Sequence, residues 1–280
     1  MPSFVAVVTS SNANIMIERR ITFALPEDGF SGWKINRLKT LSAMFRSVVI
    51  VHNLTCWDNA NIEHPLHILS LAGKQDDLCQ LHIEGSDAEL ACMVLTDFIA
   101  EHFMLVNTAH RSNKKANLPL LKALTTFQLP FPIDFHFAHN ESQDKSMILE
   151  QIAQLTSIQH HREIMLGLRD RERHSSTAIG HSIALPHLIS NKIETASLTV
   201  IQSPQPVDWQ SIKLGPVKLI ITLVLPSPPQ RALLVSFTHL TKALLDDEFC
   251  SLLTTSREPE AIKAILIHQL VKGQRACSSS

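Results

Sequence analysis

The stretch from Thr177 to His187 reads Thr-Ala-Ile-Gly-His-Ser-Ile-Ala-Leu-Pro-His and decides how the chain is interpreted. It predicts a tight loop over its first four residues, then a short apolar strand in which Ile183 and Leu185 alternate. Pro186 lacks the amide hydrogen that a strand ladder uses, so we expect pairing to stop there and leave His187 accessible. A neutral imidazole is a nucleophile that can carry a phosphoryl group on nitrogen.

The composition indicates a reduced, cytoplasmic protein with packed cores. The chain has 280 residues, of which 45% are hydrophobic and 18% charged, enough for two domains. Its net charge of −1 does not favour a nucleic-acid or membrane-surface partner. No apolar run reaches the ~18 residues of a membrane span, and the first residues lack a basic signal segment. The five scattered cysteines favour a reducing compartment.

Fifteen histidines raise the question of a metal site. His136 and His139 form a His-x-x-His pair, and His160 and His161 are adjacent. Neither pair completes a four-ligand set with the usual spacing, so we expect no metal. The glycine-rich phosphate loop of nucleotide-binding proteins is also missing, and we expect no cofactor.

Residues 1–104 are expected to form an α+β domain. The patterns predict an antiparallel sheet with helices on one face. We expect strands at Arg20–Leu25, Ser47–Val51 and Leu78–Ile83. We expect helices at Trp33–Phe45 and Asp87–Phe103.

Residues 105–132 are expected to be a linker. Ser112–Asn117 is polar, and the prolines of Leu129–Pro132 require an extended chain. The apolar patch Leu118–Leu124 leaves open a short docked helix.

Residues 133–273 are expected to be an α/β domain, followed by a tail at 274–280. Val217–Leu225 is almost continuously apolar, which predicts a central strand covered on both faces. The last helix is expected to stop at Gly273. We interpret the charge run Arg169–Arg173 as a solvated helix end rather than a binding patch.

Five motifs mark the second domain: Thr177–Gly180, Ile183–His187, Pro206–Trp209, the apolar strand that ends at Pro226, and Leu244–Phe249. Through these motifs the domain resembles the fructose/mannitol-type enzyme IIA domain of the bacterial sugar phosphotransferase system. This resemblance implies a mixed sheet with helices on both faces. It also implies that His187 accepts a phosphoryl group from the carrier HPr and passes it to a IIB domain.

A phosphorylated imidazole needs hydrogen-bond donors for its oxygens. The candidates are the hydroxyls of Ser176 and Thr177 and the backbone amides up to Gly180.

Two departures from the family concern this site. The family usually has a second histidine near the acceptor, and Leu233 occupies that place here. His239 comes six residues later, ~120° around a helix, and His181 is another nearby candidate donor. Ala178 and Leu188 stand where the family commonly has glycine, which reduces the close approach of backbone to a phosphate.

The first domain resembles HPr itself, through Pro26–Gly29, Phe45 and Glu84–Ala88. The resemblance implies an open-faced β-sandwich, and residues 1–19 lie outside it. The His-Ala-Arg-Pro signature of HPr is replaced by Ser31–Lys34, Ser-Gly-Trp-Lys. Serine cannot replace imidazole as a reversible carrier without an activating base, so we expect an HPr-like domain that is inactive as a carrier.

The leading hypothesis is therefore a histidine phosphotransferase, the IIA phosphocarrier of the phosphoenolpyruvate-dependent phosphotransferase system. HPr would be its donor and a IIB/IIC permease for a fructose-like sugar or sugar alcohol its acceptor. The protein would touch the membrane only through that permease. The alternative is a regulatory or adaptor protein whose HPr-like domain mimics the donor and whose IIA domain signals by phosphorylation or protein binding. A third reading is an interaction module without phosphorylation.

Overall fold

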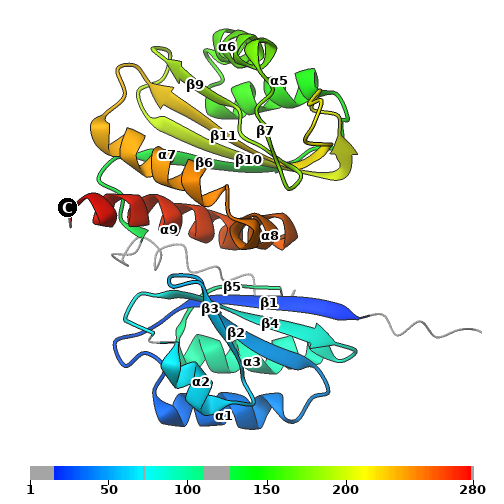
Figure 1. Ribbon diagram of the computed structural model, residues 1–280, viewed down its shortest axis with the longest axis vertical. Coiled ribbons are helices and arrows are strands. Elements are labelled where there is room, and N and C mark those ends of the chain that lie inside the picture. The colour runs from blue at the N-terminus through cyan, green and yellow to red at the C-terminus, as the bar shows by residue number, and fades with distance from the viewer. Residues whose placement is uncertain (1–15, 72, 110–126, 279–280) are drawn as a thin grey trace, which may run out of the picture. The chain divides into compact units, whose positions relative to one another are not determined.

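The computed structural model describes residues 16–71, 73–109 and 127–278. The chain divides into two compact units, Met1–Asn117 and Leu118–Ser280, which Figure 1 colours from blue to green and from green to red. The helix proposed for Leu118–Leu124 lies outside the described residues, as does the polar stretch Ser112–Asn117. No helix in the described part of the chain is long and apolar enough to cross a bilayer.

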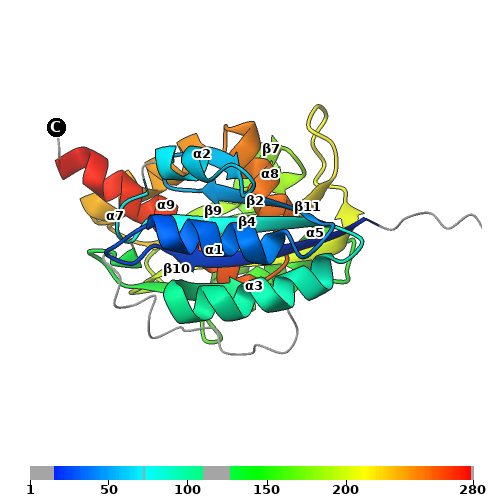
Figure 2. The same cartoon turned by 90° about the horizontal axis from the view of Figure 1, so that it is seen from below.

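The N-terminal unit is the expected open-faced sandwich. Its described strands form an antiparallel sheet in the order β3-β2-β4-β1-β5, and the helices cover one face of this sheet (Figures 1 and 2). In chain order the elements are β1 (Ile17–Ala24), α1 (Gly32–Ser42), β2 (Val48–Asn53), β3 (Asp58–Asn61), α2 (Pro65–Ser70), β4 (Leu78–Gly85), α3 (Ala88–His102) and β5 (Met104–Thr108).

The core of this unit lies between the sheet and the helices. Alternate residues of β1 such as Ile21 and Phe23 point into it, together with the apolar stripe of α3 that includes Leu95 and Ile99. Strand β5 pairs with β1, so residues 105–108, which we assigned to the linker, belong to the sheet. It follows α3 after a single residue, Phe103, which hides the boundary in the sequence.

Two histidine rings stack on the sheet. His52 of β2 and His82 of β4 have ring centroids 4.0 Å apart. Burial lowers the pKa of His82 to about 3, and the charges of Arg20 and His52 add to this effect. Burial also lowers the pKa of His52. Both rings are therefore neutral at pH 7.

This pair predicts that the N-terminal unit loses stability on acidification. His82 binds a proton near pH 6.5 in the unfolded chain and near pH 3 in the folded one. Its contribution to the free energy of unfolding is therefore fully present above pH 6.5 and is lost as the pH falls toward 3. The expected slope is about 1 kcal/mol per pH unit. Urea denaturation at pH 7, 6 and 5 measures it. His82→Phe should flatten the profile, and an unchanged slope in that variant would contradict the assignment.

The C-terminal unit is a mixed sheet with helices on both faces. The strand order is β6-β10-β11-β8-β7, and β9 also pairs with β11. Helices α5 and α6 cover one face, and α7 and α9 cover the other (Figure 1). In chain order the elements are β6 (Ile133–His139), α5 (Lys145–Thr156), α6 (His161–His174), β7 (Ala178–Gly180), β8 (Ile183–Ala184), β9 (His187–Ser190), β10 (Ala196–Val207), β11 (Val217–Pro226), α7 (Arg231–Ala243), α8 (Asp247–Thr255) and α9 (Pro259–Ser278).

Strand β11 is central, as its apolar sequence predicts. Its residues from Leu219 to Leu225 are all buried, and it pairs antiparallel with β10 and parallel with β8 and β9. This arrangement places β9, which begins at His187, on a strand that is held from both faces.

Two local predictions differ from the structure. The expected loop Thr177–Gly180 is mostly the strand β7, and the turn lies at His181 and Ser182, both with positive φ. Helix α9 continues past Gly273 to Ser278. A Cβ at Gly273 would lie 2.7 Å from Cβ of His239, so this glycine lets α7 and α9 approach and does not end the helix.

A second close approach joins α6 to β9. A Cβ at Gly167 would lie 2.9 Å from both terminal methyl carbons of Leu188. Leu188 points toward α6, and His187 and Ile189 alternate to the exposed side of β9. Leu188 therefore occupies space that Gly167 provides.

Gly167→Ala is expected to destabilise the C-terminal unit by about 1–3 kcal/mol, because the added methyl overpacks the contact between α6 and Leu188. Thermal denaturation followed by circular dichroism measures the loss. Gly32→Ala is the matched control, since a Cβ there meets nothing within 4 Å. Equal effects of the two substitutions would contradict the packing argument.

Candidate functional site

His187 lies at the start of β9. The expectation that strand pairing stops at Pro186 is wrong in one respect. The carbonyl of Pro186 accepts a hydrogen bond from the amide of Leu223 at 3.0 Å, and parallel pairing with β11 resumes at His187 opposite Leu223. Proline removes a donor but keeps its acceptor. The His187 side chain is exposed, as predicted.

Two hydrogen bonds fix the imidazole of His187. Its Nδ1 lies 3.0 Å from the carbonyl oxygen of Leu185. The guanidinium Nε of Arg171 donates to its Nε2 at 3.2 Å. A carbonyl only accepts and a guanidinium only donates, so the ring carries its proton on Nδ1, and the electron pair of the unprotonated Nε2 accepts the bond from Arg171.

Arg171 comes from the last turn of α6, within the charge run that we interpreted as solvated. That interpretation misses its role in the geometry, because Arg171 also donates to the carbonyl of Ser175 at 3.0 Å. The guanidinium is thus held by two hydrogen bonds, one to the Ser175 carbonyl and one to the unprotonated Nε2 of His187. A fixed cation in this position suits an anion bound to that nitrogen.

The neighbour of Arg171 is a buried carboxylate. Glu172 forms an ion pair with Nζ of Lys145 at 2.7 Å, and the two side chains are 3% and 11% exposed. It also accepts from the indole Nε1 of Trp209 at 3.3 Å. A polar hollow of about 520 Å³ borders this pair and is lined by both of its residues together with Arg169, Arg173 and Asp208.

The residues predicted to stabilise the phosphoryl group make bonds within the scaffold. The Thr177 hydroxyl donates to Glu172 in a short contact, and its amide donates to the same carboxylate at 3.3 Å. The Ser176 hydroxyl donates to the carbonyl of Trp209 at 3.2 Å. Gly180, at φ +93°, ends β7 just before the turn. Their role in holding phosphate stays a prediction.

The histidines expected near the acceptor have other surroundings. Leu233, at the place of the family's second histidine, is a core residue and 2% exposed. His239 packs against α9, and burial lowers its pKa. Nε2 of His181 lies 3.2 Å from Oδ1 of Asp247 at the start of α8.

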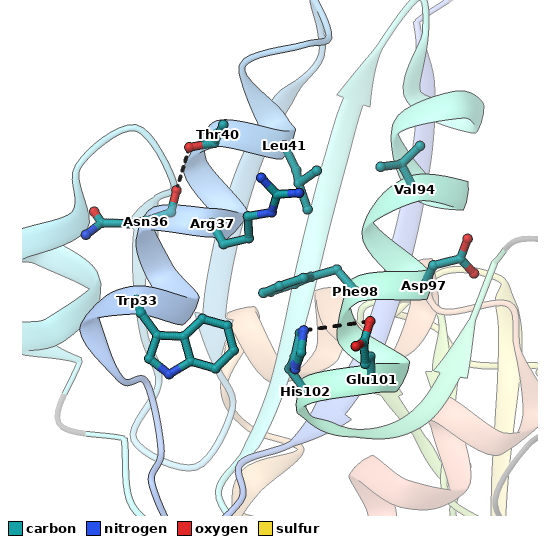
Figure 3. Close-up of a pocket in the computed structure, with 10 residues that line it drawn as sticks. All are labelled: Trp33, Asn36, Arg37, Thr40, Leu41, Val94, Asp97, Phe98, Glu101 and His102. Carbon is teal, nitrogen blue, oxygen red and sulfur yellow. Dashed lines mark hydrogen bonds and ion pairs between the residues drawn. The ribbon is translucent and has the colours of Figure 1, made fainter.

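The N-terminal unit carries Ser31–Lys34 at the start of α1. Ser31 precedes the helix without a capping side-chain bond, and Lys34 forms an ion pair with Asp28 at 2.7 Å. Figure 3 shows Trp33 beside His102 in the lining of a hollow between α1 and α3. The hollow has a volume of about 760 Å³, and the two ring centroids are 5.0 Å apart. This segment holds an aromatic contact where HPr has its phosphorylation signature.

Among the described residues, no group of three or more histidine, cysteine or acidic side chains is arranged to hold a metal ion.

The fold and the exposed imidazole together fit an enzyme IIA domain. Residues 131–269 match the family described as "Phosphoenolpyruvate-dependent sugar phosphotransferase system, EIIA 2". The C-terminal unit is thus an enzyme IIA domain of this family, as its motifs predicted.

Relatives of two kinds share this domain. A nitrogen regulatory protein of Bradyrhizobium diazoefficiens is 27% identical over 128 residues, which is 46% of this chain and 83% of that protein. A multiphosphoryl transfer protein of Shigella flexneri is 29% identical over 112 residues, 40% of this chain. The match spans 13% of the length of that second relative.

The order of the strands and helices in the N-terminal unit is that of the HPr-like fold. A crystal structure of the phosphocarrier protein HPr from Bacillus anthracis aligns with a TM-score of 0.26 and 21% identity. The alignment covers 30% of this chain and 98% of that one.

Proposed function

We propose that the chain is a cytoplasmic phosphocarrier of the phosphotransferase system that accepts a phosphoryl group on Nε2 of His187. The observation that carries this proposal is the pair of bonds on the ring. Leu185 holds the proton on Nδ1, which leaves Nε2 as the nucleophile, and Arg171 lies 3.2 Å from Nε2.

The transfer is a displacement at phosphorus. The electron pair of Nε2 forms a new P–N bond as the P–N bond of a phosphohistidine donor breaks, and its electrons return to the donor nitrogen. Positive charge that builds on the ring is shared by Nδ1–H and stabilised by the Leu185 carbonyl. An oxygen of the arriving group then accepts from Arg171 in place of Nε2. The bond to the Ser175 carbonyl keeps the guanidinium beside the ring, where it offsets negative charge.

The donor in this proposal is phospho-HPr, and the acceptor is a IIB domain of a permease for a fructose-like sugar or sugar alcohol. The family of the C-terminal unit supports this class of partners. The HPr-like unit does not supply the phosphate, because Ser31 stands where HPr carries its acceptor histidine.

The test is incubation with labelled phosphoenolpyruvate, enzyme I and a competent HPr. Acid-labile label on the wild type that is lost in His187→Ala supports the proposal. Absence of label, or label unchanged in His187→Ala, would refute it. His181→Ala, which changes a histidine in the adjacent turn, should keep the label.

A regulatory protein is the second candidate. Three observations favour it: relatives named nitrogen regulatory protein, Ser31 at the place of the HPr acceptor histidine, and the buried Leu233 at the place of the second histidine. In this case His187 accepts label but IIB domains do not remove it. Chasing the labelled protein with purified IIB domains distinguishes the two functions.

A further inference from the structure

We propose that Glu172 is a positioning residue that holds Arg171 against His187, and that Lys145, Thr177 and Trp209 assist it. This inference rests on the proposed function, because it concerns the same site. It assigns a task to a buried carboxylate that touches neither the acceptor ring nor any group transferred to it.

The first step is the direction of two consecutive side chains. Arg171 and Glu172 both lie in the last turn of α6, yet Arg171 reaches His187 and Glu172 is 7% exposed and faces the core. The two side chains therefore hold the same helix end from opposite sides.

The second step is the segment that follows α6. From one side, Arg171 donates to the carbonyl of Ser175 at 3.0 Å. From the other, Glu172 accepts both the amide and the hydroxyl of Thr177. The stretch from Ser175 to Thr177 is thereby held between them. If Glu172 released Thr177, the carbonyl that anchors the guanidinium would also be free to move.

The third step is the support of Glu172 itself. Nζ of Lys145 bridges the carboxylate at 2.7 Å and the carbonyl of Trp209 at 3.1 Å. The Ser176 hydroxyl donates to that same carbonyl. The indole Nε1 of Trp209 donates to Glu172. Nζ of Lys145 lies over the indole ring, 5.2 Å from the ring centroid. Lys145, Thr177 and Trp209, from three separate segments of the chain, thus converge on one carboxylate.

The charges of the network fit a site that receives a phosphoryl group. Lys145 neutralises Glu172, so the dianion expected on His187 does not face a bare buried carboxylate. Arg171 is then the net positive charge beside the acceptor nitrogen. A small displacement of its guanidinium costs rate because transfer depends on alignment.

The experiment is a double-mutant cycle with Arg171→Ala and Glu172→Gln. The rate of label transfer from phospho-HPr is measured by rapid quench. Glu172→Gln alone should slow transfer about 10-fold, and the double variant should be no slower than Arg171→Ala alone. Glu163→Gln, an exposed change on the same helix, should leave the rate unchanged. Additive effects, or a rate for Glu172→Gln within twofold of wild type, would overturn the proposal.

A second variant protects the test against misfolding. Thr177→Val removes one hydroxyl without changing charge or size, and should give a smaller slowing that also disappears in the Arg171→Ala background. If Thr177 instead holds phosphate directly, its effect persists in that background and the positioning role fails.

A measurement on the unphosphorylated protein tests the role of Glu172 independently of the proposed phosphorylation of His187. Nitrogen chemical shifts of the His187 ring report the bond from Arg171 to Nε2. In Glu172→Gln the Nε2 shift should move toward that of Arg171→Ala, and an unmoved shift would count against positioning. Should the wild type accept no label, the proposed function fails, whereas this measurement still decides the role of Glu172.

Discussion

Arg171→Ala is expected to slow the phosphorylation of His187 about 100-fold, the usual cost of removing one fixed donor from a site where charge develops. The reason is local. The guanidinium lies 3.2 Å from the acceptor nitrogen and is held there by the carbonyl of Ser175. Arg171→Lys should recover part of the rate, because lysine restores the charge but not the planar pair of donors. Rapid-quench transfer from phospho-HPr measures each rate.

Arg173→Ala is the control for this result. Arg173 lies two residues further along α6, is exposed and pairs with Asp170 at 3.2 Å, so its loss should change neither rate nor fold. Equal slowing in the two alanine variants would mean that the general positive field of the helix end matters, and not the contact with His187.

Lys145→Met is expected to destabilise the C-terminal unit by about 3 kcal/mol, because it leaves a buried carboxylate without its counter-ion. The melting temperature should fall by about 10 °C. Thr177 and Trp209 still donate to Glu172, which keeps the loss at the lower end of the range for broken buried pairs.

Two variants check the cause. Lys145→Met combined with Glu172→Gln removes the stranded charge, and most of the lost stability should return. Lys192→Met, in an exposed turn, should stay within ~0.5 kcal/mol of wild type. If the double variant is as unstable as Lys145→Met alone, the loss is one of packing and not of charge.

Much of the fold was predictable because apolar residues repeat with clear periods. The helix expected at Trp33–Phe45 is α1, Gly32–Ser42, and the apolar run at Val217–Leu225 is the buried strand β11. Strand β6, Ile133–His139, was missed although its first five residues alternate apolar and polar side chains; none of its residues is fully buried. Its partner β10 comes from far along the chain.

The candidate site was predictable in part. The accessibility of His187 follows from its motif, but the contact with Arg171 depends on how α6 packs against β9. One signal was present in the sequence. Ile164, Leu168 and Glu172 are four residues apart and share one face of α6, so the carboxylate lies on the buried stripe. A charge in that position needs a partner in the core, although sequence alone does not reveal that Lys145 is that partner.

Ser31 at the start of α1 has a consequence for kinetics. If the N-terminal unit carries no acceptor, as Ser31 at the place of the HPr histidine predicts, the proposed phosphorylation of His187 is a bimolecular event. Its rate then rises with the concentration of free phosphorylated donor, whatever the length or flexibility of the chain between the two units. A fused active carrier would instead give a rate independent of concentration. His187 would therefore follow the supply of donor in the surrounding solution rather than a store carried on the same polypeptide.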